Sequence, residues 1–259
     1  MSVLVFDIET IPDVESGRRL LDLDATLSDA DVARAMATVH RRDSGSDFLP
    51  LYLHRIVSIA VVFANSERLR VYALNSEQAP DDERQLLERF FDGLTRFTPT
   101  LVSWNGAGFD LPVIHYRALL HGVAAPRYWD QGEDDREFRY NNYLNRYHTR
   151  HLDLMDVLSG YQLRAAAPLD GVAMLLGLPG KLGMDGSKVW DAYLAGDLAG
   201  ICQYCETDVL NTYLVYLHFE RMRGGLEPSG YEREIERVRQ YLSEDPRPHL
   251  QSFLAAWAG

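Results

Sequence analysis

The chain has 259 residues, enough for one large domain or two small ones. With 46% hydrophobic and 25% charged residues it has the composition of a globular protein, and no apolar run is long enough to cross a bilayer. A formal net charge of −12 argues against a broad basic surface that coats nucleic acid, but it allows an enzyme that takes one strand end into a metal-filled cleft.

The first elements in chain order are strands. Residues 2–8 form a near-continuous apolar run, which predicts a strand buried on both faces. They contain no basic region and no small-residue cleavage site, so we expect a core strand in a cytoplasmic protein and not a signal peptide. Residues 55–64 and 68–74 predict a hairpin. The polar residues 13–50 predict one helix with Ser28 as its N-cap, inserted near a cleft.

Helical patterns dominate the rest of the chain. Apolar residues recur at helical spacing over 80–97, and an apolar strand at 100–104 leads through a glycine-containing turn into a helix over 110–121. Residues 127–150 lack periodicity and predict a long loop, ordered only in part, whereas 152–258 is almost entirely helical in pattern. Early strands followed by helices predict a single α/β domain.

Three separated motifs carry acidic residues. Asp7 and Glu9 lie two apart on a strand, so both side chains leave the same face. Asp110 follows a glycine-containing turn and opens a helix, where it is either an ordinary N-cap or an oriented ligand. Tyr204 and Asp208 are four apart on a helix and share a face. An ordinary tyrosine pKa near 10 makes the phenol a hydrogen-bonding group rather than a strong base.

Carboxylates that converge without compensating bases require cations. Hard oxygen ligands favour Mg²⁺ or Mn²⁺, and two such ions bridged by acids suit in-line attack on a phosphodiester. Four carboxylates carry four negative charges, which two divalent ions balance. The metal-free site is therefore expected to be self-repelling, with raised carboxyl pKa values.

In their order and spacing, the motifs D-x-E at 7–9, N-x3-F-D at 105–110 and Y-x3-D at 204–208 resemble the DEDD superfamily of 3′–5′ exonucleases. The pattern is most similar to stand-alone bacterial proteins that resemble the proofreading exonuclease domain of family B DNA polymerases. The alternative subclass has a histidine five residues before the last aspartate, where this chain has Gln203, so the resemblance is to the tyrosine subclass, DEDDy. It covers roughly residues 2–223.

The resemblance implies a ribonuclease H-like mixed sheet flanked by helices, with a helix-rich C-terminal half. It implies that four carboxylates hold two divalent ions and that Tyr204 positions the attacking water; these ligands are Asp7, Glu9, Asp110 and Asp208. We expect one exonuclease domain over 1–259, with a core over about 2–223 and a helical extension over about 224–259.

The expected activity is release of nucleoside 5′-monophosphates from the 3′ end of a single strand, with DNA favoured over RNA. We expect no polymerase domain to follow the motifs, so editing would act in trans or through a protein partner in DNA replication or repair. The alternatives are an RNA-directed exonuclease, an inactive nucleic-acid-binding or scaffold protein of the same fold, and a redox protein based on the C-x-x-C pair Cys202 and Cys205.

Further residues are weaker candidates. Possible substrate contacts are Thr10, Asn105, Phe109 and the chain's only lysines, Lys181 and Lys188. Asp153 is expected to support the metal ligands from behind, and His148 with His151 has the wrong spacing for a zinc site. Residues 127–150 interleave arginines with aromatic residues and form either a groove that stacks on a single strand or an ordinary surface loop.

Overall fold

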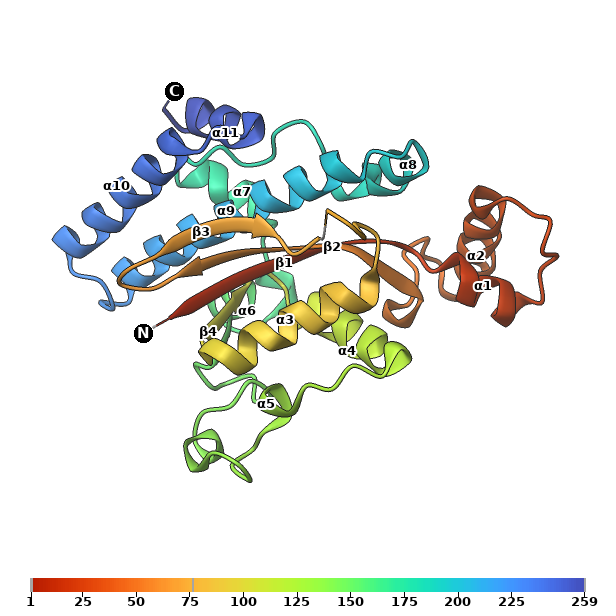
Figure 1. Ribbon diagram of the computed structural model, residues 1–259, viewed down its shortest axis with the longest axis horizontal. Coiled ribbons are helices and arrows are strands. Elements are labelled where there is room, and N and C mark those ends of the chain that lie inside the picture. The colour runs from red at the N-terminus through yellow and green to blue at the C-terminus, as the bar shows by residue number, and fades with distance from the viewer. Residues whose placement is uncertain (1, 76, 259) are drawn as a thin grey trace.

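A five-stranded mixed sheet forms the centre of the computed structural model, which describes residues 2–75 and 77–258 (Figure 1). The strand order is β3-β2-β1-β4-β5; β1 runs antiparallel to β2 and parallel to β4, β3 pairs antiparallel with β2, and β5 pairs parallel with β4. The strands are β1 (Val3–Pro12), β2 (His54–Ala64), β3 (Leu69–Ala73), β4 (Thr100–Ser103) and β5 (His151–Asp153).

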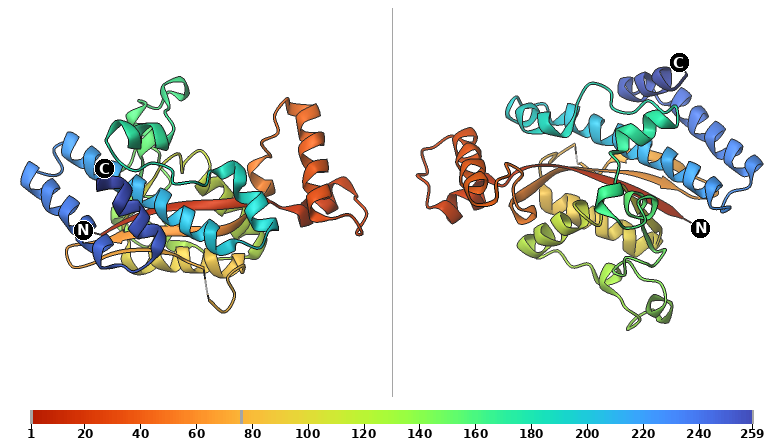
Figure 2. Two further views of the ribbon diagram at one scale, coloured as in Figure 1. Left: turned by 90° about the horizontal axis from the view of Figure 1, so that it is seen from above. Right: turned by 180° about the vertical axis from the view of Figure 1, so that it is seen from behind.

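Helices cover both faces of this sheet (Figures 1 and 2). They are α1 (Val14–Leu21), α2 (Asp29–Ser44), α3 (Glu83–Phe97), α4 (Asp110–His121), α5 (Pro126–Trp129), α6 (Leu154–Leu158), α7 (Leu169–Leu175), α8 (Val189–Leu194), α9 (Leu198–Met222), α10 (Pro228–Glu244) and α11 (Pro248–Ala258). Short 3-10 helices occur at η1 (Leu51–Leu53), η2 (Arg136–Arg139), η3 (Leu163–Ala165) and η4 (Gly186–Lys188). The arrangement confirms the predicted ribonuclease H-like α/β fold and its helix-rich C-terminal half.

The alternation of side chains along β1 decides which helix each residue meets. Leu4, Phe6 and Ile8 pack in a cluster with α3 and α4, whereas Val5 packs in a second cluster with α9. A strand residue two positions further on shares the face of Val5, so Asp7 and Glu9 are directed toward α9. No helix in the described part of the chain combines the length and apolar character needed to cross a membrane.

The polar segment after β1 contains two helices, and the prediction of one was wrong. Ser28 does cap α2, since its Oγ accepts a hydrogen bond from the Asp31 amide at 3.1 Å. The missed helix, α1, begins after Asp13, whose carboxylate accepts from the Ser16 amide at 3.0 Å. Both helices pack together and project beyond the end of β1 as an arm, defined here as residues 13–50 (Figure 1).

Two later segments also differ from expectation. Strand β5 lies inside a stretch expected to be helical, because three residues are too few to show a periodic pattern. The 127–150 segment is largely irregular, as expected, but it is packed: Tyr128, Phe138 and Tyr143 are buried in the core. These three rings therefore cannot stack on a nucleic acid, whereas Trp129, Tyr140 and Tyr147 of the same segment are exposed.

Candidate active site

Asp7 and Glu9 lie between the sheet and α9. The Cys205 Sγ is 3.4 Å from the backbone oxygen of Asp7 and 3.6 Å from its Oδ2. One ligand atom from each of Asp7, Glu9 and Cys205 lies within 4.8 Å of the others. The carboxyl end of β1 thus places two acids against the middle of α9.

The turn between β4 and α4 brings the third acid to β1. Asp110 Oδ1 accepts a hydrogen bond from the Ile8 amide at 3.2 Å, which fixes this carboxyl between the two acids of the first motif along the strand. Asn105 has a left-handed φ of 62°, and a Cβ on Gly106 would lie 2.3 Å from the Ser103 Oγ. The turn therefore needs a residue that tolerates αL, followed by glycine.

Asp153 holds this turn from behind. Its carboxylate accepts from the amides of Asn105 and Ala107, both at 2.9 Å, and also caps the start of α6. Asp153 contacts the backbone that positions Asp110. These hydrogen bonds explain why a buried acid lies at the end of a short strand, and support of the metal ligands by Asp153 stays a prediction.

Helix α9 supplies the fourth acid and the tyrosine. Asp208 is buried, and its Oδ1 has no hydrogen-bond partner. The phenol of Tyr204, one turn earlier, lies beside the same carboxylate and lowers its pKa against the larger effect of burial. A buried carboxylate oxygen without a donor is costly unless a cation or another donor reaches it.

The four carboxyls destabilise one another's charged forms. Burial, followed by the charges of Asp110, Glu9 and Asp208, raises the pKa of Asp7 well above its usual value. Burial and the charges of Asp208 and Asp110 do the same for the pKa of Glu9. Burial raises the pKa of Asp110 to about 7 and that of Asp208 to about 6. The mutual effects show that all four carboxyls share one electrostatic environment.

This donor set fits hard divalent cations. Cys205 is the one soft atom nearby, but burial and the charges of Asp7 and Glu9 raise the pKa of its thiol, so the thiol stays protonated and is a poor ligand. Burial likewise raises the thiol pKa of Cys202, the opposite of what a redox pair needs. The carboxylate oxygens, including the unpartnered Asp208 Oδ1, remain as ligands suited to Mg²⁺ or Mn²⁺.

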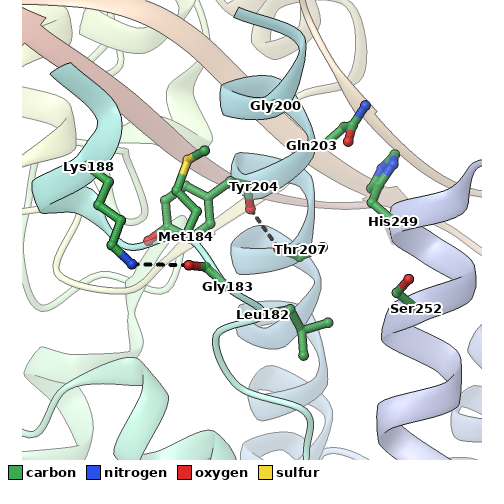
Figure 3. Close-up of a pocket in the computed structure, with 10 residues that line it drawn as sticks. All are labelled: Leu182, Gly183, Met184, Lys188, Gly200, Gln203, Tyr204, Thr207, His249 and Ser252. Atoms are coloured by element: carbon green, nitrogen blue, oxygen red, sulfur yellow. Dashed lines mark hydrogen bonds between the residues drawn. The ribbon is translucent and has the colours of Figure 1, made fainter. Parts of the chain in front are cut away.

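The two lysines occupy different positions. Lys181 Nζ lies 6.0 Å from the centre of the Tyr204 ring, and its charge lowers the pKa values of Glu9 and Asp208 against the larger effect of burial. Lys188 pairs with Asp185 at 3.2 Å and donates to the Gly183 oxygen at 3.2 Å. It lines a cavity of about 380 Å³ beside Tyr204 (Figure 3).

The remaining candidates flank the first motif. Thr10 Oγ1 lies 2.9 Å from His54 Nδ1, and the half-buried Phe109 meets the His54 ring at a centroid distance of 5.3 Å. His148 accepts from the Asn142 amide at 3.0 Å and His151 bonds Ser103 at 2.8 Å, so these two histidines have separate structural partners.

Sequence reasoning missed Glu206, which lies inside the third motif. Its carboxylate accepts from the Ala73 amide at 2.9 Å and from Arg247 Nη1 and His249 Nε2, both at 2.7 Å. Glu206 thereby ties β3 and the start of α11 to the helix that carries Tyr204 and Asp208. The arginine and histidine lie more than forty positions away in sequence, so no local pattern could indicate this role.

The raised pKa values predict a specific pH dependence for the metal-free protein. Because the folded-state pKa values exceed those of an unfolded chain, the stabilising contribution is present at low pH and is lost as pH rises through about 6 and 7. We expect Tm in chelator to fall between about pH 5 and pH 8, and Mn²⁺ to restore it, as measured by differential scanning fluorimetry. Asp110→Asn with Asp208→Asn should flatten this profile; a Tm that rises with pH in chelator would contradict the assignment.

The fold and the acidic cluster together define a ribonuclease H-like protein with a candidate metal centre. Residues 46–257 match the family described as predicted 3′–5′ exonuclease related to the exonuclease domain of PolB. Because the match covers more than half of the chain, the protein belongs to this family. Its span begins near the end of the arm and includes α10 with nearly all of α11. A search of curated proteins found no match.

Proposed function

We propose that this protein is a metal-dependent 3′–5′ exonuclease that releases nucleoside 5′-monophosphates from single-stranded DNA. The observation that carries this proposal is the convergence of four carboxyls, with one buried oxygen unpartnered and a tyrosine hydroxyl beside the same aspartate. Family membership supports the reaction class. The substrate, the metal ions and the roles of individual residues are inferred from the site.

In this proposal two Mg²⁺ or Mn²⁺ ions are held by Asp7, Glu9, Asp110 and Asp208. When bound, such ions lower the pKa of water and stabilise the charge that develops on the leaving oxygen. The protein contributes a dry and rigid ligand set: Ile8 and Asp153 fix the position of Asp110, and α9 fixes Asp208.

Tyr204 is assigned the orientation of the attacking water, as in the DEDDy type. Burial, followed by the charge of Asp208, raises the pKa of its phenol, so the hydroxyl keeps its proton and cannot act as a base at neutral pH. It can hold a water through hydrogen bonds from its position beside Asp208. We therefore assign Tyr204 to positioning and not to proton abstraction.

A catalytically inactive nucleic-acid-binding protein is the main alternative. Such a protein gains nothing from bringing together four mutually repelling carboxyls, three of them buried, because this arrangement costs stability without a cation. An RNA-directed exonuclease would differ only in its contacts near the sugar 2′ position. We also propose that the chain forms a single exonuclease domain and that the protein is cytoplasmic. A replication or repair partner that presents the 3′ end is part of the same proposal.

The function is tested by digesting matched 5′-labelled DNA and RNA oligomers with the full chain and Mn²⁺. A ladder of fragments that shortens from the 3′ end, more rapidly on DNA, is expected, and chelator should abolish it. Endonucleolytic products or metal-independent cleavage would reject the mechanism, whereas a faster ladder on RNA would select the RNA-directed alternative.

Lys181→Ala should raise KM for a long single strand several-fold and reduce the dependence of KM on salt, because one cation near the site is lost. Lys188→Ala is the matched control, since Lys188 is already paired with Asp185 and is expected to change KM less. Steady-state kinetics at two salt concentrations measure both effects. Equal KM values for wild type and Lys181→Ala would remove Lys181 from the substrate contacts.

A further inference from the structure

Four aromatic side chains from two distant segments form two contacting pairs along α4, called here the aromatic stripe. One comes from the end of the arm, one from η1, and two from the start and middle of α4; they are Phe48, Tyr52, Phe109 and Tyr116. Phe48 meets Phe109 at a ring-centroid distance of 5.8 Å, and Tyr52 meets Tyr116 at 6.2 Å. Phe109 is the N-cap of α4 and Tyr116 lies seven residues later in the helix, so the two residues are on the same side of it.

One end of this aromatic stripe adjoins the chain segments that carry Glu9 and Asp110. Phe109 directly precedes Asp110 in the chain. His54 joins the same end: its ring lies 5.1 Å from Phe48 and 5.3 Å from Phe109, and its Nδ1 is 2.9 Å from Oγ1 of Thr10, the residue after Glu9. The stripe therefore starts beside the carboxyls and leads away from them along α4.

The rings of the stripe are more exposed than core aromatic residues. Phe48 is 59% exposed, Tyr52 49% and Tyr116 48%, whereas Phe6 and Phe90 are fully buried. The backbone that carries the exposed rings is nevertheless anchored, because Leu49 and Leu53 are buried beneath the arm. Anchored, exposed aromatic faces in a row next to a polar site are typical of a binding surface.

We propose that the aromatic stripe is the track on which the bases of the single-stranded substrate stack as the 3′ end enters the carboxylate site. This proposal rests on the proposed exonuclease function and extends it to several nucleotides of the strand. Each base presents a π-face, so stacking holds a strand without reading its sequence.

Charge favours bases over phosphates as the groups recognised here. The chain has 38 acidic against 26 basic residues and a net charge of −12, which disfavours a broad basic surface that binds backbone phosphates. Burial lowers the pKa of His54, which leaves the end of the stripe near the acids uncharged at neutral pH. A neutral aromatic track binds a polyanion with a weak dependence on salt, and this distinguishes it from a phosphate-binding groove.

The test compares KM for a trinucleotide with KM for a 15-nucleotide strand. Wild type should bind the longer strand better, because more bases reach Tyr52 and Tyr116. The double variant Tyr52→Ala with Tyr116→Ala should raise KM for the 15-mer by about ten-fold and change the trinucleotide much less. Phe48→Ala should raise KM for both. Tyr72→Ala, a 41% exposed tyrosine on β3, is the matched control and should leave both values unchanged.

A fluorescent 2-aminopurine placed a few positions from the 3′ end reports stacking directly. Its fluorescence should be quenched on wild type and recover on the double variant, and circular dichroism shows whether that variant is folded. Unchanged KM for the 15-mer together with unchanged quenching overturns the proposal. A double variant that alters the oligomeric state but not KM assigns the stripe to a protein interface instead. Failure of wild type to degrade any strand refutes the proposed function, a separate result.

Discussion

Asp208→Ala is expected to abolish exonuclease activity while leaving the metal-free protein at least as stable as wild type. The variant removes one of four carboxyls that raise one another's pKa values, together with an oxygen that has no hydrogen-bond partner. Losing a metal ligand should cost more than the roughly 10–100-fold that loss of a residue supporting a ligand typically costs. The Tm increase that Mn²⁺ gives wild type should shrink in the variant.

Two further variants separate the ligand role from general damage. Asp208→Asn preserves shape and should be as inactive as the alanine variant, while Glu232→Ala, an exposed acid on α10, should retain full activity. Activity is measured on a 5′-labelled strand, and stability by thermal melting with chelator and with Mn²⁺. Wild-type-like cleavage by Asp208→Ala, in protein free of contaminating nuclease, would refute the assignment of the site.

The fold class and the grouping of the carboxyls into one site could be predicted from the sequence, because each motif is a local pattern of residues. A near-continuous apolar run predicts β1, and the two-residue spacing of Asp7 and Glu9 predicts that they share a face. Tyr204 and Asp208 are four residues apart on α9, and this spacing places them on the same face of the helix. Ordered motifs on a strand, a turn and a helix could therefore be joined by family resemblance, even though no single motif was decisive.

Interactions between distant segments could not be predicted in this way. Asp13 caps α1 and also binds Arg117, and Glu206 gathers partners from β3 and the start of α11. Nothing in the residues near Asp13 or Glu206 indicates these partners. The aromatic residues of 127–150 were interpreted as a groove or a surface loop, and the burial of three of them in the core was not predicted because burial is a property of the tertiary structure.

Arg117→Ala is expected to cause the largest loss of stability, about 3–5 kcal/mol of unfolding free energy. Arg117 lies on α4 with its side chain 5% exposed, and it contacts Glu83 at 2.6 Å and Asp13 at 2.5 Å, both similarly buried. Removing the guanidinium leaves two carboxylates that still cannot reach water. Glu83 retains the amide of Ile56 and the ring of His121 as partners, and Asp13 retains the amide of Ser16.

This loss should exceed that of any exposed ion pair, because the penalty arises from the charges left behind and not from the attraction removed. Arg34→Ala is the matched control: its partner Asp31 is on the same exposed helix surface, and the expected change is below about 1 kcal/mol. Urea denaturation measures both variants. A loss below about 1 kcal/mol for Arg117→Ala would show that Asp13 and Glu83 are hydrated or protonated once the arginine is gone.

Asp13 also caps α1, so the same variant should expose the arm to proteolysis before the sheet unfolds. Because the arm carries Phe48, this buried ion pair also helps to hold Phe48 against Phe109.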